Sequence, residues 1–243
     1  MTDAAPIEVY FWPTPNGKKI TIALEEMELA YKIVPVNIGA GDQFKPEFLA
    51  ISPNNRMPAI VDPDGPGGEP ISIFESGAIL QYLGRKTGKF YPQDERARVK
   101  VDEWLHWQMG NLGPMAGQSH HFLHYAGKIE PDPEKLAYGV ERYRNETERL
   151  YGVLDMVLAD GRTFIAGDYS IADMAIWPWI IPKYQSQDID AFPHLKAWRE
   201  RVIARPAVQR GKDVGAELRN NLAADSKDAE KARSVLFGQR ARR

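Results

Sequence analysis

NNRMPAI (residues 54–60) and FESGAI (residues 74–79) decide how this chain folds and what it can hold. Pro58 stands directly before a short β-like run, although proline has no N–H for the ladder and is normally excluded from strand interiors. A proline placed there predicts a cis peptide after Met57, with the Met57 backbone turned outward as a free hydrogen-bonding edge. Glu75 and Ser76 then open a helix, whose first N–H groups favour a bound anion. Together the two stretches predict a site that holds a small peptide by its backbone and its charged end.

Residues 7–90 alternate between short apolar runs and segments with apolar residues at helical spacing. The first strand, helix and second strand predict a parallel pair joined by a right-handed crossover. Residues 62–68 are dense in turn residues and predict a hairpin between the third and fourth strands. The order is β-α-β-α-β-β-α, a thioredoxin-like arrangement, with strands expected at 7–11, 31–36, 59–61 and 71–73 and helices at about 20–27, 45–51 and 76–86.

From about residue 95 the pattern predicts only helices, at roughly 95–124, 134–159, 170–187 and 193–204. Ser170 and Asp173 have the spacing of a capping box, which we interpret as structural. The expected fold is therefore an α/β thioredoxin-like N-terminal domain, residues 1–90, followed by an all-α domain, residues 95–212. Residues 213–243 carry many charges and few large apolar side chains, and are expected to form a charged C-terminal tail.

The composition excludes several classes of function. A net charge of -2 gives no general attraction to nucleic acid or to an acidic membrane surface. The sequence contains no apolar run of the ~18–20 residues that cross a bilayer, and its first residues lack the layout of a secretory signal. We therefore expect a cytoplasmic protein with no nucleic-acid or membrane partner.

The chain contains no cysteine. This excludes structural disulfides, a Cys-x-x-Cys redox pair and a cysteine nucleophile. Any thiol chemistry must use a thiol that arrives with a ligand. The three histidines His120, His121 and His124 lack further ligands at site-like spacing, so no metal site is predicted.

Several motifs together resemble one family. They are residues 13–20 (PTPNGKKI), 41–44 (GDQF), 52–60, 74–79, 113–115, 117–118, 120–122 (HHF), 141–143 and 169–173. On these motifs, residues 7–210 resemble the cytosolic glutathione transferases. The run TPNGKK with HHF is most similar to the bacterial nu class of that family. The resemblance implies the transferase architecture, a homodimer, and glutathione or glutathione disulfide as the bound co-substrate, without a metal.

The resemblance also gives the two central stretches a role. Met57 is joined to Pro58 by the expected cis peptide. Its backbone would pair with the cysteinyl backbone of glutathione as a miniature β-augmentation. Glu75 would accept from the γ-glutamyl ammonium, and Ser76 with the helix N-terminus would donate to its carboxylate. The alternative for Ser76 is an ordinary helix cap. Gln43 and Arg56 would bind the glycine carboxylate, because a guanidinium suits a planar partner with two oxygens.

Thr14 and Asn16 follow the first strand, where this fold places its reactive centre. A hydroxyl or amide donor near the sulfur at a helix N-terminus favours the thiolate. The alternative is that Thr14 only caps the helix. The resemblance suggests that Arg142 reaches the site of the neighbouring subunit. Lys18 and Lys19 follow the site loop and would add positive potential there. The alternative, which we favour, is a solvated helix face.

Three functions remain open at this stage. The first is an enzyme that reduces a small disulfide, with bound glutathione supplying the reactive thiols. The second is conjugation of glutathione to an electrophile, or glutathione-dependent cleavage of an ether or thioether. The third is a non-catalytic glutathione-binding regulator. The nu-class resemblance favours the first. The sequence does not name the physiological substrate, because a cleft is shaped by tertiary structure.

Overall fold

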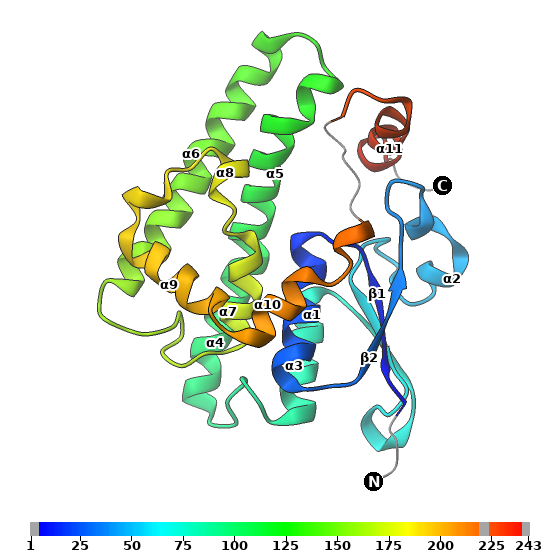
Figure 1. Cartoon of the computed structure of the whole chain (residues 1–243), viewed down its shortest axis with the longest axis vertical. Coiled ribbons are helices and arrows are strands. Elements are labelled where there is room, and N and C mark those ends of the chain that lie inside the picture. Colours follow the sequence, from blue (N-terminus) through cyan, green and yellow to red (C-terminus); the bar gives the residue numbers. More distant parts are fainter. Residues whose placement is uncertain (1–4, 219–223, 240–243) are drawn as a thin grey trace. The chain divides into compact units, whose positions relative to one another are not determined.

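A computed structural model of the chain describes residues 5–218 and 224–239. The chain divides into two compact units (Figure 1). One comprises residues up to Leu83 together with those from Arg210 onward, and the other runs from Gly84 to Gln209. This division differs from the predicted one, because the segment expected to be a separate charged tail belongs to the first unit.

The first unit contains a four-stranded mixed sheet of order β2-β1-β3-β4. Its strands are β1 (Ile7–Phe11), β2 (Tyr31–Pro35), β3 (Ala59–Asp62) and β4 (Ile71–Phe74). β1 and β2 pair in parallel, whereas β3 is antiparallel to both β1 and β4. The predicted thioredoxin-like order and hairpin are therefore confirmed.

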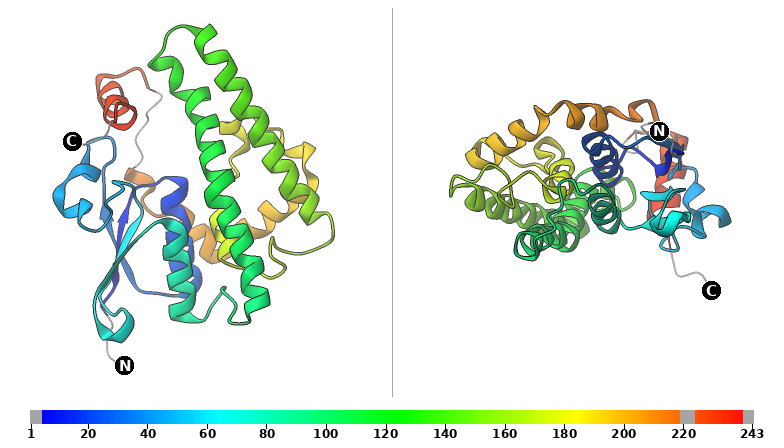
Figure 2. Two further views of the ribbon diagram at one scale, coloured as in Figure 1. Left: turned by 180° about the vertical axis from the view of Figure 1, so that it is seen from behind. Right: turned by 90° about the horizontal axis from the view of Figure 1, so that it is seen from below.

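Three helices accompany the sheet along the chain: α1 (Pro15–Met27), α2 (Pro46–Leu49) and α3 (Ser76–Thr87). α1 and α3 lie along one face of the sheet, as Figures 1 and 2 show. Val9, Phe11 and Ile60 of the sheet are fully buried, as is Ile20 of α1. The core forms because alternate strand residues and one helical stripe are apolar.

The chain from residue 210 onward joins this unit through close contact with α1. Gly211 belongs to α10 (Pro206–Asp213), and a Cβ at this position would lie 2.6 Å from Ile22 Cα. Thr21 Oγ1 donates to the carbonyl of Gly211 at 2.7 Å, and Arg210 Nε lies 2.6 Å from Glu25 Oε2. A last helix, α11 (Lys227–Phe237), follows in the same unit. Among the described residues of this segment, the charged side chains of α10 and α11 thus belong to helices.

The second unit is helical: α4 (Glu95–Trp107), α5 (Gly113–His124), α6 (Pro133–Leu158), α7 (Ile171–Ile176), α8 (Pro182–Gln185) and α9 (Pro193–Ile203). α5 and α6 pack side by side. A π-helical turn, Gln108–Leu112, joins α4 to α5, so the predicted segment 95–124 is continuous but not regular. Pro114 has no N–H for the ordinary i→i−4 bond, and the preceding Gly113 N–H bonds to Gln108 O instead.

The single helix predicted at 170–187 is wrong. α7 ends at Ile176 and is followed by a 3-10 turn, Trp177–Trp179, before α8 begins at Pro182. Ile181 precedes that proline, which disfavours helical backbone at Ile181. Its φ and ψ are -126° and 67°.

The predicted capping box is present at the start of α7. Ser170 Oγ accepts from the Ala172 N–H at 3.3 Å, and Asp173 Oδ2 accepts from the Ser170 N–H at 3.0 Å. Asp173 Oδ1 also accepts from Ile165 N–H at 3.1 Å and from Trp198 Nε1 at 2.8 Å. Burial raises the pKa of the Asp173 carboxyl to about 6, although these donors oppose the rise. This carboxylate therefore ties α7 to a loop and to α9.

Candidate functional site

One edge of the sheet brings the predicted site residues together. Tyr10 of β1 pairs with Ala59 of β3, and Ala59 pairs with Phe74 of β4. Because β3 is antiparallel to both neighbours, its first residue lies beside their last ones. The loop after β1, the residues before β3 and the residues after β4 therefore emerge at the same edge. β2 runs parallel to β1, so the loop that carries Gln43 starts from this edge as well.

Thr14 both caps a helix and contacts the segment before β3. Its backbone is extended, and Oγ1 accepts from the Gly17 N–H at 3.3 Å, with Pro15 at the first helical position of α1. The same hydroxyl donates to Met57 Sδ at 3.6 Å. A thioether is a weak acceptor, so the Thr14 hydroxyl makes only a weak hydrogen bond to Met57 Sδ at the sheet edge. Asn16, in the first turn of α1, is partly buried.

The Met57–Pro58 peptide is cis, as predicted. Met57 is 8 % exposed and belongs to a small apolar cluster with Trp12, Val36 and Phe48. Ser52 Oγ donates to the Arg56 carbonyl at 2.8 Å, while the Arg56 side chain is exposed. The Arg56 guanidinium is therefore accessible to a ligand, and its backbone is fixed.

Glu75 lies between β4 and α3 in a left-handed conformation, with φ of 70°. The left-handed conformation costs a residue with a Cβ about 1–2 kcal/mol. The Glu75 side chain is exposed, and Ser76 beside it is buried. A strained, exposed carboxylate at a helix start is typical of a functional position.

Lys19 is buried beside the site, which the sequence analysis did not expect. Its side chain is 1 % exposed, and Nζ donates to Ser76 Oγ at 3.3 Å. The interpretation of Lys19 as a solvated residue is therefore wrong. Burial lowers the pKa of the Lys19 ammonium to about 7, and the nearby Glu75 carboxylate opposes part of that shift. Lys19 precedes the apolar residues Ala23 and Met27 by four and eight positions, so its place on the inner face of α1 was readable from the helical period.

Gln43 is buried in a 3-10 turn, Asp42–Phe44. Its Nε2 donates to the Ile38 carbonyl at 3.0 Å, and its buried Oε1 has no hydrogen-bond partner. The glycine-carboxylate role stays a prediction, and the amide group is committed in part to holding its own loop. Tyr10 of β1 packs its ring against Phe48 and donates its hydroxyl to Glu8.

Arg142 lies on α6 in the second unit, exposed to solvent. Its NH1 is 3.9 Å from Glu146 Oε2, whereas Arg149 takes both oxygens of the same carboxylate at 2.7 and 2.9 Å. The long pair holds the Arg142 guanidinium only weakly. Its predicted role toward a neighbouring subunit stays a prediction.

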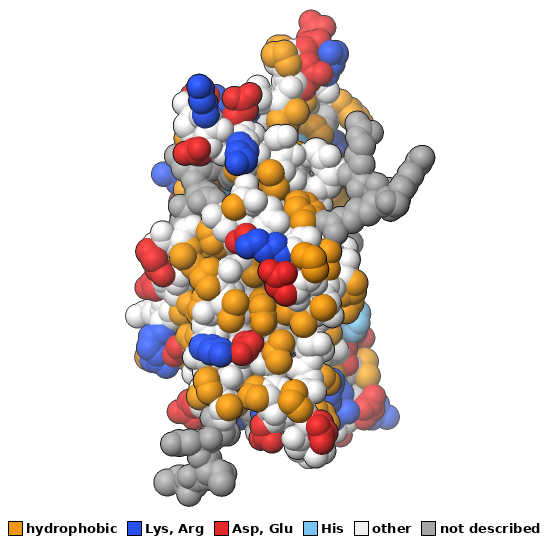
Figure 3. Space-filling model, turned by 90° about the vertical axis from the view of Figure 1, so that its right-hand side faces the viewer, with side chains coloured by type: hydrophobic (Ala, Val, Ile, Leu, Met, Phe, Trp, Pro, Cys, Tyr) orange, Lys and Arg blue, Asp and Glu red, His pale blue; other side chains and the backbone are white. Residues whose placement is uncertain are grey.

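The described residues, 5–218 and 224–239, contain no group of three or more His, Asp or Glu side chains placed to hold a metal ion. Within the same ranges no helix has the length and apolarity to span a bilayer. On the face drawn in Figure 3, lysine and arginine side chains are interspersed with acidic and apolar ones.

Comparison with known proteins agrees with this geometry. The family model for the glutathione S-transferase N-terminal domain matches residues 5–85, and that for the C-terminal domain matches residues 118–206. The disulfide-bond oxidoreductase YfcG of Escherichia coli strain K12 is 51% identical over 203 residues, covering 83% of this chain and 92% of the relative.

Two crystal structures are also similar. A glutathione transferase from Pseudomonas putida, with one glutathione disulfide bound per subunit, is 43% identical with a TM-score of 0.81, covering 88% of this chain and 94% of the other. A glutathione transferase family member from Pseudomonas fluorescens, with two glutathiones bound, is 46% identical with a TM-score of 0.80, covering 87% and 94%. The two domain matches and the identity to full-length relatives show that this chain belongs to the glutathione S-transferase family.

Proposed function

We propose that this protein is a nu-class enzyme that uses glutathione to reduce small disulfides. The observation that carries the proposal is the convergence of Thr14, Met57 and Ser76 at one sheet edge in a chain without cysteine. The 51% identity to a disulfide-bond oxidoreductase supports the same reaction. Similar transferases with two glutathiones or one glutathione disulfide bound fit a site in which the ligands supply every sulfur.

The charged end of glutathione fits the junction between β4 and α3. The γ-glutamyl carboxylate would lie at the N-terminus of α3, where Ser76 and the first N–H groups donate. The Lys19 ammonium behind Ser76 adds positive charge to the same place. Glu75 is exposed beside it and would accept from the γ-glutamyl ammonium. Gln43 and Arg56, from two loops at this edge, would bind the glycine carboxylate.

Thr14 would activate the glutathione sulfur by moving its hydrogen bond from the Met57 thioether to that sulfur. In the structure its hydroxyl donates to the Met57 thioether. A thiolate carries a full charge and is a much stronger acceptor, so rotation of this hydroxyl toward bound glutathione stabilises the ionised form. Asn16, in the first turn of α1, would add an amide donor. The two side chains would thus lower the pKa of the glutathione thiol.

The reaction then needs no protein sulfur. The bound thiolate attacks one sulfur of the substrate disulfide, the S–S bond breaks, and the other sulfur leaves as a thiolate that takes up a proton. A second glutathione thiolate attacks the resulting mixed disulfide. The products are glutathione disulfide and two substrate thiols. We propose that the enzyme acts as a cytoplasmic homodimer, with Arg142 contributing to the partner's site.

A paired assay tests this proposal. Purified protein is given glutathione with either 2-hydroxyethyl disulfide or an aryl halide, and the initial rates are compared. Disulfide turnover well above aryl-halide turnover supports the reductase. The opposite ratio would show that conjugation is the main activity. Tight glutathione binding with neither turnover would identify a non-catalytic binding protein.

A further inference from the structure

α11 lies beyond the residues that the two family models match, since the second match ends at residue 206. It nevertheless belongs to the same compact unit as the sheet. Ser226 caps the helix by accepting from the Ala229 N–H, and Ala229, Ala232 and Arg233 are buried. The helix thus lies outside the two family-model matches and belongs to the unit that carries the candidate site.

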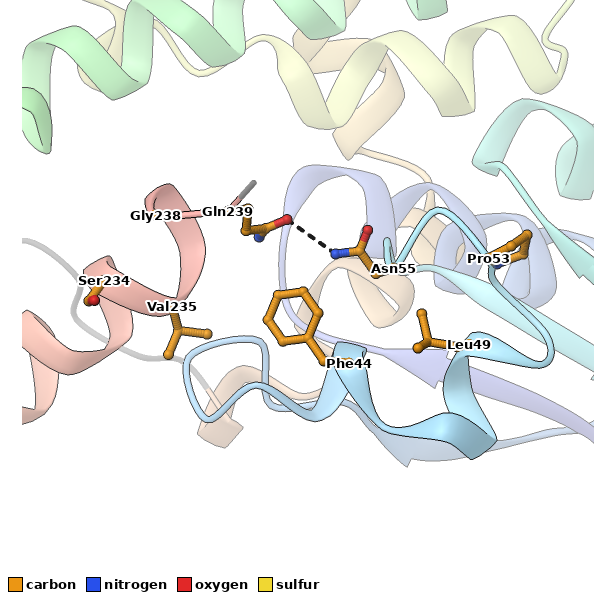
Figure 4. A pocket seen from close by; sticks show the side chains of 8 residues that line it. All are labelled: Phe44, Leu49, Pro53, Asn55, Ser234, Val235, Gly238 and Gln239. Atoms are coloured by element: carbon orange, nitrogen blue, oxygen red, sulfur yellow. Dashed lines mark hydrogen bonds between the residues drawn. The ribbon is translucent and has the colours of Figure 1, made fainter. Parts of the chain in front are cut away.

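The end of α11 lies against two loops of that unit (Figure 4). Asn55 Nδ2, in the turn before β3, donates to Gln239 Oε1 at 3.1 Å. Val235 of α11 and Phe44 of the loop after β2 line the same pocket. The end of α11 is therefore hydrogen-bonded to the turn before β3 and lies beside the loop after β2.

These two loops carry the residues that we propose for the glycine end of glutathione. Gln43 lies two residues after Gly41, in the 3-10 turn Asp42–Phe44. Phe44 of the same turn faces α11. Asn55 directly precedes Arg56 and Met57. Its own backbone is left-handed, with φ of 49°, and its N–H bonds to the Ser52 carbonyl at 2.9 Å. The Asn55 side chain thus anchors the turn that sets the direction of Arg56.

An open pocket separates part of the end of α11 from the two loops. Its volume is about 540 Å³, and it is lined by Phe44 and Leu49 on one side and by Ser234 and Val235 on the other. Close packing would fill a space of this size with side chains. A small change at the end of α11 is therefore expected to shift the two loops without disturbing the core of the sheet.

We propose that α11 is a positioning element of the glutathione site, which holds the Gln43 loop and the Arg56 turn through Val235 and the Gln239–Asn55 hydrogen bond. The proposal rests on the glutathione-binding function proposed above. Gln239 and Asn55 act as positioning residues, since neither is required to touch the reacting sulfur. Their effect falls on the affinity for glutathione and not on the rate at saturation.

The test uses the full-length chain with Gln239→Ala, Asn55→Gly and the double variant. Asn55→Gly removes the side chain but keeps a residue that tolerates positive φ. Lys231→Ala is the matched control, because this exposed side chain lies on the same helix. Glutathione Kd is measured by calorimetry, kcat and KM for glutathione in the disulfide assay, and Tm by thermal unfolding.

Each single variant should weaken glutathione binding about two- to tenfold, the range expected for one hydrogen bond. The kcat should stay within twofold of the wild-type value. The double variant should bind glutathione no more weakly than the weaker-binding single variant, because both substitutions remove the same hydrogen bond. Unchanged affinity, an additive double variant or an equal loss in Lys231→Ala would overturn the positioning role while leaving the proposed function intact. Absence of glutathione binding by the wild-type protein would overturn both. Binding without turnover would remove only the reductase, since the Kd comparison still decides the role of α11.

Discussion

Two buried ionisable residues lie beside serines at helix starts in this protein, and their surroundings differ. In the helical unit, the Asp173 carboxylate accepts from two backbone N–H groups, the Ser170 hydroxyl and the Trp198 indole, all within the chain. In the sheet unit, the Lys19 ammonium donates to Ser76 beside an exposed, left-handed Glu75. The first arrangement satisfies a charge internally. The second places a charge behind a helix start that is suited to an external anion.

The comparison teaches how to separate a structural cap from a binding site. Both oxygens of the Asp173 carboxylate accept hydrogen bonds from donors within the chain, so the role of this group is to stabilise the fold. Burial of Lys19 instead lowers its pKa to about 7, and a bound carboxylate would reverse that shift. Substitutions in the two places should therefore fail in different ways.

The largest effect is expected from Asp173→Asn. The amide group would turn an N–H₂ toward at least one of the donors at Ile165 or Ser170, leaving buried polar groups unpaired. The free energy of unfolding should fall by about 3–5 kcal/mol, as for a broken buried charged network. Urea unfolding at pH 7 measures this loss. Asp168→Asn, at an exposed carboxylate nearby, serves as the control and should change stability by less than about 0.5 kcal/mol. A small loss at Asp173 would contradict the structural assignment.

The next effect is on catalysis, at Thr14. Thr14→Ala removes both the helix cap and the donor, whereas Thr14→Ser keeps both. We expect kcat for disulfide reduction to fall about 100-fold in Thr14→Ala, the range for loss of one donor to a developing or bound anion. Stability should fall by only about 1 kcal/mol, from loss of the cap. If turnover survives in Thr14→Ala while stability falls, Thr14 is merely a cap, like Ser170.

Lys19→Met tests the other side of the comparison. With a folded pKa near 7 and an unfolded value of 10.5, the unfolded chain binds more protons between these limits. The stability of the wild-type protein should therefore gain up to about 1.4 kcal/mol per pH unit from this group as pH rises through that window. Lys19→Met should remove this gain, which urea unfolding at pH 7 and pH 9.5 measures.

Binding should show the opposite pH trend. A glutathione carboxylate at α3 favours charged Lys19, so binding takes up a proton, and affinity should weaken as pH rises from 7 to 9. The ratio of wild-type to Lys19→Met affinity isolates Lys19 from the titration of glutathione itself. We expect about tenfold tighter binding by the wild type at pH 7, the size of a charge-assisted contact, and a smaller ratio at pH 9. A ratio independent of pH would show that Lys19 is as purely structural as Asp173.

The difference between the two places also explains what the sequence could predict. The Ser170–Asp173 box is a local pattern four residues long, and its geometry follows from the backbone of one helical turn. The β-α-β-α-β-β-α order and the Met57–Pro58 and Glu75–Ser76 pairs were predictable for the same reason. The position of Lys19 on the inner face of α1 was readable from the helical period, but its partner Ser76 was not, because that contact joins residues 57 positions apart.

Two further features were not predicted. The helix predicted at 170–187 is interrupted because Pro182 restricts Ile181, a local signal that the apolar periodicity of the segment masked. The last helix carries many charges, and only Leu236 and Phe237 indicated that it could dock on the body. The surface on which it docks could not be predicted, because a contact such as Asn55 to Gln239 joins residues 184 positions apart.

The smallest effect on stability is expected at Arg142, which tests whether the helical unit also contributes to the site. Arg142→Ala removes a long, exposed ion pair with Glu146, so the free energy of unfolding should change by less than about 0.5 kcal/mol. Arg149→Ala removes the shorter pair with the same carboxylate and is the matched control. If Arg142 binds glutathione in a partner subunit, glutathione affinity falls several-fold in Arg142→Ala and not in Arg149→Ala, about the size of one exposed charge-assisted contact. Equal, small effects in both variants would confine recognition of the ligand's charges to the sheet unit. Arg142 and Arg149 would then bind only the Glu146 carboxylate that they share.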